Sequence, residues 1–181
     1  MVVLVAYATR HGATTGIAER VAATLCRDGT PAQAVPVHEV RDVRAYDAVI
    51  LGAAAYSSHW LKAATTFARR NRVALRERPV WLFSSGPLGS EPVDSSGRDL
   101  LVTCRPKEFD ELIPLLRARG EQVFFGAFNP EDRPVTIGEH VFAMVPGSRH
   151  ALPAGDFRDW PAIDAWAAGV AAVLAGTTLQ P

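Results

Sequence analysis

Short apolar runs that do not alternate with polar residues constrain the fold of this chain more than any other feature. Most are rich in β-branched side chains, and they occur at residues 2–7, 32–37, 47–54, 79–85 and 121–128. A strand that is covered on both faces has this pattern, whereas a strand with one face in water alternates. Stretches with helical periodicity lie between and after them, at 15–26, 61–72, 107–119 and 160–174.

Strands that alternate with helices predict βαβ units, and hence a mostly parallel sheet with helices on both faces. The fold class is therefore a three-layer α/β sandwich. With 181 residues and 48% apolar content, the chain is expected to form a single domain over 1–181. Pro36 removes a ladder donor and marks 32–37 as an edge strand. Two long connections, 86–105 and 129–159, are candidates for functional loops.

The turn at 9–14 leads directly from the first strand into the first helix. In a doubly wound sheet such a turn offers backbone N–H groups and the positive end of a helix dipole to an anion. The motif GxxxxGK[ST] of triphosphate sites and the motif GxGxxG of dinucleotide sites are both absent here, and no acidic residue precedes Glu19. A phosphomonoester that is bound without a metal fits what remains. The alternative is that Thr14 or Thr15 simply caps the helix.

Two further strand ends carry residues that suit a flat ligand. The third run continues into Tyr56, His59 and Trp60, and the fourth ends in the small residues of LFSSGPLG at 82–89. Carboxyl ends of parallel strands meet at one edge of a sheet, where ligands of such folds bind. An aromatic cofactor with one phosphate would use all three loops.

These residues carry a resemblance to a known family. The turn TRHGAT resembles the FMN phosphate loop of flavodoxins, which precedes the first helix. Within that family the chain is most similar to domains related to menaquinone-dependent protoporphyrinogen dehydrogenase. The resemblance covers nearly the whole chain, in TRHGAT (9–14), LGAAAYSSHWLKAATTFARRN (51–71), PVWLFSSGPLG (79–89) and GDFRDWPAIDAWA (155–167). It implies a flavodoxin-like, five-stranded parallel sheet in the order 2-1-3-4-5 and FMN as the cofactor.

The resemblance also implies which residues contact FMN. Around the phosphate it places Thr9, Arg10, His11, Gly12, Ala13 and Thr14. On one side of the isoalloxazine ring it places Tyr56, Ser57, Ser58, His59 and Trp60, and on the other Ser84, Ser85, Gly86 and Pro87. His11 stands where the family has Thr or Asp, and Ala13 replaces a polar residue, so backbone contacts are expected at these two positions.

The balance of charge bears on the function. Nineteen basic and nineteen acidic residues give a net charge of zero, without the basic footprint of a nucleic-acid binder. Flavodoxins that act as carriers are typically acidic, so the balance favours an FMN oxidoreductase acting on a small redox substrate, a quinone or porphyrinogen-like compound. The alternative is a flavodoxin-type electron carrier that serves a redox protein and performs no substrate chemistry.

His59 is the candidate catalytic residue, because a histidine titrates near neutrality and could donate a proton to substrate or flavin. It could equally make a local hydrogen bond. Trp60 could stack on the flavin or pack beneath its loop.

The remaining features exclude other classes. Cys26 and Cys104 are far apart and form no CxxC pair, so neither a disulfide framework nor a zinc or other metal site is expected. The opening run is too short for a transmembrane segment and lacks the pattern of a secretory signal, which predicts a cytoplasmic protein.

Overall fold

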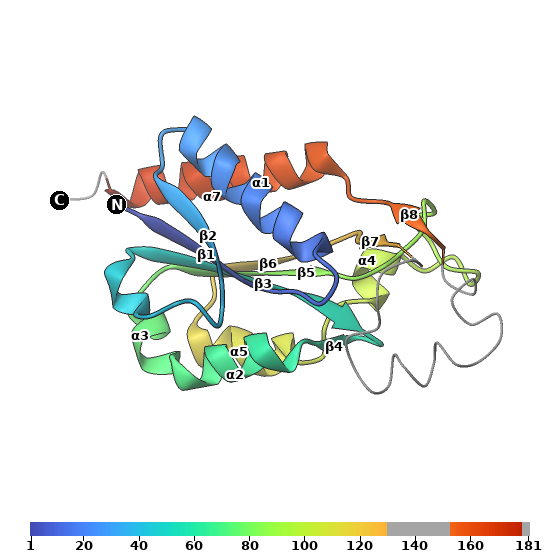
Figure 1. The fold of residues 1–181 in the computed structure, drawn as a ribbon, viewed down its shortest axis with the longest axis horizontal. Coiled ribbons are helices and arrows are strands. Elements are labelled where there is room, and N and C mark those ends of the chain that lie inside the picture. Colours follow the sequence, from blue (N-terminus) through green and yellow to red (C-terminus); the bar gives the residue numbers. More distant parts are fainter. Residues whose placement is uncertain (130–152, 179–181) are drawn as a thin grey trace.

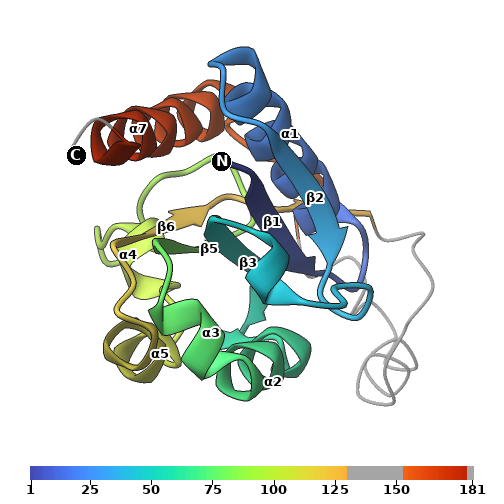
Figure 2. The ribbon, with the colours of Figure 1, turned by 90° about the vertical axis from the view of Figure 1, so that its left-hand side faces the viewer.

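The computed structural model describes residues 1–129 and 153–178. A parallel sheet forms the middle of three layers, as Figures 1 and 2 show. Its strands follow the order β2-β1-β3-β5-β6. Their bounds are Val3–Ala8 for β1, Ala32–Pro36 for β2, Ala48–Tyr56 for β3, Val80–Ser85 for β5 and Gly120–Phe124 for β6. The predicted α/β fold is confirmed.

The sheet differs from the predicted order 2-1-3-4-5 by one additional strand. This strand, β4 (His59–Trp60), is antiparallel to the end of β3 and pairs Ala55 with Trp60. Ser57 and Ser58 connect the two strands with φ angles of 51° and 58°. Two consecutive left-handed residues make a tight hairpin turn, but this turn normally uses Asn or Gly. Two serines therefore gave no hairpin signal in the sequence.

Helices cover both faces of the sheet (Figure 2). One face carries α1 (Ala13–Arg27) and α7 (Trp160–Thr178), which contact each other. The opposite face carries α2 (Lys62–Arg70), α3 (Arg72–Arg76) and α5 (Phe109–Leu116). A 3-10 turn lies at Val43–Ala45, and a short helix, α4 (Leu100–Thr103), lies in the long connection that follows β5.

Two predicted elements end earlier than the sequence suggests. The expected helix at 61–72 is interrupted at Asn71, whose side-chain amide donates to the Phe67 carbonyl 3.0 Å away. The expected strand at 121–128 leaves the sheet after Phe124. Its last part becomes β7 (Ala127–Phe128), which pairs with β8 (Gly155–Asp156) in a separate antiparallel ribbon. The remainder of the predicted connection, at 130–152, lies outside the described residues.

The core occupies both sides of the sheet, as the unbroken apolar runs predict. Ile17, Val21 and Leu25 recur at helical spacing on α1 and are fully buried. Close packing also reaches into the strands, because a Cβ at Gly52 would overlap the Phe83 ring on the neighbouring strand. Among the described residues, no helix combines the length and apolarity needed to cross a lipid bilayer.

Candidate functional site

The turn at 9–14 presents backbone rather than side-chain donors at the start of α1. Gly12 has φ +82° and donates its N–H to Thr9 Oγ1 at 3.0 Å. The first intrahelical bond runs from Gly16 N–H to the Gly12 carbonyl at 3.4 Å. The N–H groups of residues 13–15 therefore lie at the open end of the helix. No acidic residue occupies the first turn of α1, so this end favours an anion.

Thr14 points away from this opening. Its side chain is fully buried, and its Oγ1 lies 2.8 Å from Ser85 Oγ. Gly12 is the N-cap of α1, and no side chain caps the helix. The capping alternative for Thr14 is therefore wrong. Its hydroxyl ties α1 to β5, while its backbone N–H stays at the helix end.

Arg10 connects the turn to the hairpin at 56–60. Its guanidinium lies over the Tyr56 ring, 4.5 Å from the ring centroid. The Tyr56 side chain is 39% exposed, so one aromatic residue remains at the surface of the predicted flavin site. The structure thus brings together the two loops that follow β1 and β3.

The Glu108 carboxylate is hydrogen-bonded to two residues of the hairpin. His59 Nδ1 lies 2.9 Å from one carboxylate oxygen, and the Trp60 N–H donates to the other at 2.9 Å. Burial acts to raise the pKa of Glu108, but these bonds outweigh it, so the pKa lies below its ordinary value. The His59 side chain is 58% exposed, and its acidic partner, 49 residues away, could not be predicted from the sequence.

The Trp60 ring lies in the core beneath the hairpin. It is 3% exposed, packs edge-on against Phe109 with centroids 5.1 Å apart, and donates Nε1–H to the Ala53 carbonyl. In this structure the indole packs beneath the loop, which is the second of the two alternatives for Trp60. A tryptophan at a strand end has the same sequence pattern whether its ring faces a ligand or packs in the core.

The segment 84–87 is held against neighbouring strands. Ser84 and Ser85 are buried, and Ser85 meets Thr14. Gly86 N–H donates to the Phe124 carbonyl at 3.1 Å, and Gly126 N–H donates to the Pro87 carbonyl at 2.9 Å. Ser84 Oγ has no hydrogen-bond partner in the described part of the chain.

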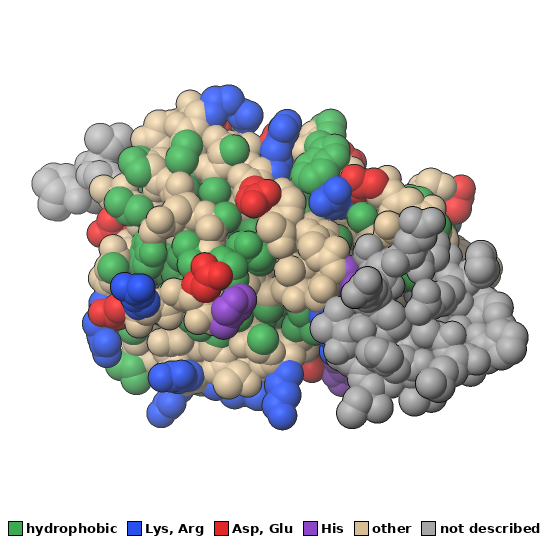
Figure 3. All heavy atoms as spheres, in the orientation of Figure 1, with side chains coloured by type: hydrophobic (Ala, Val, Ile, Leu, Met, Phe, Trp, Pro, Cys, Tyr) green, Lys and Arg blue, Asp and Glu red, His purple; other side chains and the backbone are tan. Residues whose placement is uncertain are grey.

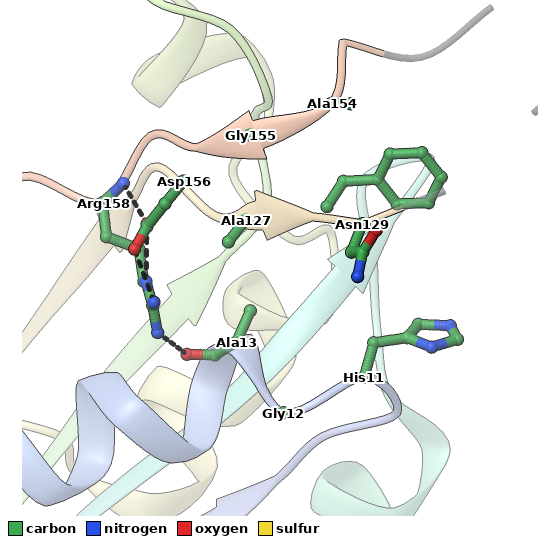
Figure 4. A pocket seen from close by; sticks show the side chains of 10 residues that line it. His11, Gly12, Ala13, Ala127, Asn129, Ala154, Gly155, Asp156 and Arg158 are labelled. Atoms are coloured by element: carbon green, nitrogen blue, oxygen red, sulfur yellow. Dashed lines mark hydrogen bonds and ion pairs between the residues drawn. The ribbon is translucent and has the colours of Figure 1, made fainter. Parts of the chain in front are cut away.

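A cavity of about 700 Å³ lies between the turn and the β7–β8 ribbon. Figure 4 shows Arg158 and Asp156 at one end of it and His11 and Asn129 at the other. Three of the predicted site residues line it: His11, Gly12 and Ala13. The other lining residues were not predicted, namely Ala127, Phe128, Asn129, Ala154, Gly155, Asp156 and Arg158. Two features of the sequence pointed towards some of them, the length of the connection at 129–159 and the family resemblance of 155–167, but neither placed a side chain at the cavity.

Arg158 lies beside the helix end and is paired with an acidic neighbour. Its Nη1 donates to the Ala13 carbonyl at 3.2 Å, and its guanidinium pairs with Asp156 at 2.6 Å. This pairing holds the pKa of the Asp156 carboxyl below its usual range. A Cβ at Gly16 would lie 2.6 Å from Arg158 Nη1, so a glycine lets the guanidinium reach the first turn of α1.

The described residues offer no metal site in addition. Within 1–129 and 153–178, no three His, Cys, Asp or Glu side chains gather as metal ligation would require. The open end of α1 can accept an anion, and Arg10 lies in the turn that leads to it.

Fold and site together define a doubly wound α/β protein with an anion-accepting turn at the switch point between β1 and β3. The chain belongs to the flavodoxin-domain family, whose model matches residues 4–131. This membership supports a flavin-binding, electron-transfer role. No curated protein matches the chain in sequence.

Solved structures share the fold at low identity. Rubredoxin:oxygen oxidoreductase from Desulfovibrio gigas matches with a TM-score of 0.60 and 10% identity, covering 99% of this chain but 37% of its own. A flavodoxin mutant from Pseudomonas aeruginosa gives 0.54 and 14%, covering 95% and 97%. Megasphaera elsdenii flavodoxin gives 0.51 and 19%, covering 67% and 84%. The present chain thus spans about a third of the first of these proteins.

Proposed function

We propose that the chain binds FMN and transfers electrons between this flavin and a small redox substrate, such as a quinone or a porphyrinogen-like compound. The open end of α1, directly beside a cavity of about 700 Å³, is the observation that carries the proposal. Its volume lies in the usual range for sites of small molecules and cofactors. The turn at 9–14 would hold the phosphate through its N–H groups, with Arg10 adding positive charge.

The bound isoalloxazine would supply the electron chemistry, and the protein would bind and orient it. Tyr56 with Arg10 on one side and Gly86 with Pro87 on the other would border the ring. Hydrogen bonds join the backbone of Gly86 to Phe124 at the end of β6 and that of Pro87 to Gly126 just before β7, which suits a rigid wall. Trp60 would support the hairpin from within the core.

His59 is the group that we propose for proton transfer to or from the reacting centre. Its bond to Glu108 fixes the orientation of the imidazole, while more than half of the side chain stays exposed. A histidine oriented by a carboxylate is a common arrangement for general acid–base catalysis.

The nature and stoichiometry of the cofactor test the first part of the proposal. Purified protein reconstituted with FMN or FAD is freed of excess flavin, denatured, and the released flavin identified by mass. We expect retention of one FMN per chain, because one phosphate turn is present. Retention of FAD in preference to FMN would overturn the assignment.

The identity of the electron partner distinguishes the oxidoreductase from the alternative, an electron carrier that serves a redox protein. Reduced holoprotein is mixed with soluble quinones, and oxidised holoprotein with porphyrinogen, while the flavin absorbance is followed in a stopped-flow instrument. Saturable rates above those of free FMN, reduced in His59→Gln, would support the oxidoreductase. Rates equal to free FMN, with fast transfer to a redox protein, would establish the carrier.

A further inference from the structure

Arginine side chains gather at the end of the molecule opposite the turn at 9–14. In Figure 3 Lys and Arg side chains lie at the lower left, over α2 and α3, and Figure 1 places α3 far from β7 and β8. A hollow of about 430 Å³ lies there between α3 and α5. It is lined by Arg72, Val73, Arg76, Glu77, Leu115 and Arg117, which we name the arginine groove.

The charges of this groove are not balanced locally. Arg72, Arg76 and Arg117 make no ion pair with a carboxylate in the described part of the chain, whereas Arg69 nearby is paired with Glu111. Glu77 lies 3.7 Å from Arg78, so that arginine already offsets the only negative charge among the lining residues. A chain with zero net charge thus concentrates three unpaired guanidinium groups around one hollow.

Apolar side chains complete the groove. Val73, the second residue of α3, is 59% exposed, and Leu115 is partly buried against the core. Arginines at helix ends can simply face water, but an exposed valine among them gains nothing from water. Guanidinium groups bind carboxylates in a bidentate manner and are enriched where proteins contact each other.

We propose that the arginine groove binds an acidic segment of another protein, in which at least two carboxylates flank one apolar side chain. The carboxylates would pair with the arginines, and the apolar side chain would cover Val73. A nucleic acid fits less well, because the exposed valine in the groove requires an apolar partner that a phosphate backbone does not offer.

The arginine groove lies far from the turn at 9–14, where we propose that the flavin binds. β5 has six residues and so extends about 20 Å from this end of the sheet towards the opposite edge. Binding here therefore requires no flavin, and the inference stands independently of the proposed function.

Fluorescence anisotropy of a labelled peptide, Glu-Glu-Leu-Glu-Glu, tests the proposal on the full chain at low salt. We expect saturable binding that weakens about tenfold in the triple variant R72Q/R76Q/R117Q, and weakens with salt as screening lengths shorten. Val73→Ser should weaken binding about threefold. Arg41→Gln, at an exposed arginine outside the groove, is the matched control and should bind as the wild type does.

Three outcomes would overturn the inference. The first is an affinity that the triple variant leaves unchanged, or that Arg41→Gln lowers equally. The second is tighter binding of a single-stranded oligonucleotide, insensitive to Val73→Ser, which would assign the groove to nucleic acid. The third is displacement of the peptide by inorganic phosphate at equal affinity, which would make it a small-anion site. FMN titrations of the same variants should be unchanged and report separately on the proposed function.

Discussion

The turn after β1 and the hairpin after β3 leave the same edge of the sheet, and Arg10 and Tyr56 connect them. In the turn, the backbone N–H groups of 13–15 stay at the open end of α1. In the hairpin, the Trp60 N–H and the His59 imidazole are bonded to Glu108, and the indole is buried. The turn keeps donors for a ligand, whereas most of the hairpin's polar groups stabilise the protein itself.

This difference teaches that residue type alone does not identify a ligand contact. Both loops combine hydroxyl, histidine and glycine or aromatic residues at a strand end. What separates them is whether a partner elsewhere in the fold occupies each polar group. Substitutions that alter stability in one loop and ligand binding in the other test the comparison directly.

Removal of the Trp60 side chain should have the largest effect. Trp60→Ala leaves a cavity beneath the hairpin and should lower the free energy of unfolding by about 3–5 kcal/mol. Urea unfolding of the flavin-free protein measures this loss. Tyr56→Ala, at a half-exposed aromatic residue of the same loop, should lose less than about 1 kcal/mol. Similar losses for both variants would contradict the burial difference between them.

The Thr14 hydroxyl should matter for stability more than for the ligand. Thr14→Val leaves Ser85 Oγ without its partner in a buried site and should lower the free energy of unfolding by about 1–3 kcal/mol. Thr14→Ser keeps a hydroxyl and should lose much less stability than Thr14→Val. Thr15→Val, at the next residue, should change the free energy of unfolding by less than about 0.5 kcal/mol.

FMN titration of the folded Thr14 variants completes this test. Because the hydroxyl faces Ser85, Thr14→Val should bind FMN within about threefold of wild type, a difference below 1 kcal/mol. A loss of a hundredfold, with folding intact, would show that the hydroxyl turns towards the phosphate when flavin binds.

The strands could be predicted because burial on both faces leaves a local pattern. Val3 to Ala6 and Val49 to Leu51 are fully buried, and their runs were visible without any knowledge of the fold. The turn at 9–14 could also be predicted, since it joins a strand to a helix over a few residues. The hairpin strand β4 could not, because Ser57 and Ser58 adopt a backbone that serines rarely adopt.

Contacts that join distant residues could not be read from the sequence at all. Arg158 and Ala13 are separated by 145 positions, and His59 and Glu108 by 49. The two residues of each pair do not lie in one motif, so no local pattern predicts that they meet. The seven cavity-lining residues that were missed and the burial of the Trp60 ring both follow from such contacts.

Gly12 tests whether the turn depends on its backbone. Its φ of +82° is unfavourable for residues with a Cβ, although no atom lies within 4 Å of where that Cβ would be. Gly12→Ala should therefore cost about 1–2 kcal/mol of stability through backbone strain alone. Gly12→Asn should cost less, since Asn tolerates this conformation. We expect FMN affinity to fall in the same order, and equal affinities in both variants would contradict a backbone site.

Glu108 should produce the smallest effect and the one that depends on pH. Desolvation raises its pKa, yet the bonds from Trp60 N–H and His59 outweigh this and place it below 4.5 in the folded protein. A lowered pKa means that the folded state favours the ionised form. The resulting stabilisation is complete above pH 4.5 and is lost as the pH falls through the folded pKa.

Glu108→Gln removes this charge while keeping a side chain of the same size. We expect a loss of about 0.5–1 kcal/mol at pH 7, because the carboxylate is partly solvated. Below pH 4 the difference from wild type should shrink, since protonation has then removed the same charge from the native residue. Urea unfolding at pH 7 and pH 3, with Glu19→Gln at an exposed glutamate of α1 as the control, measures it. A difference that stays constant between the two pH values would mean that Glu108 supports the hairpin by packing, and that His59 and Trp60 draw nothing from its charge.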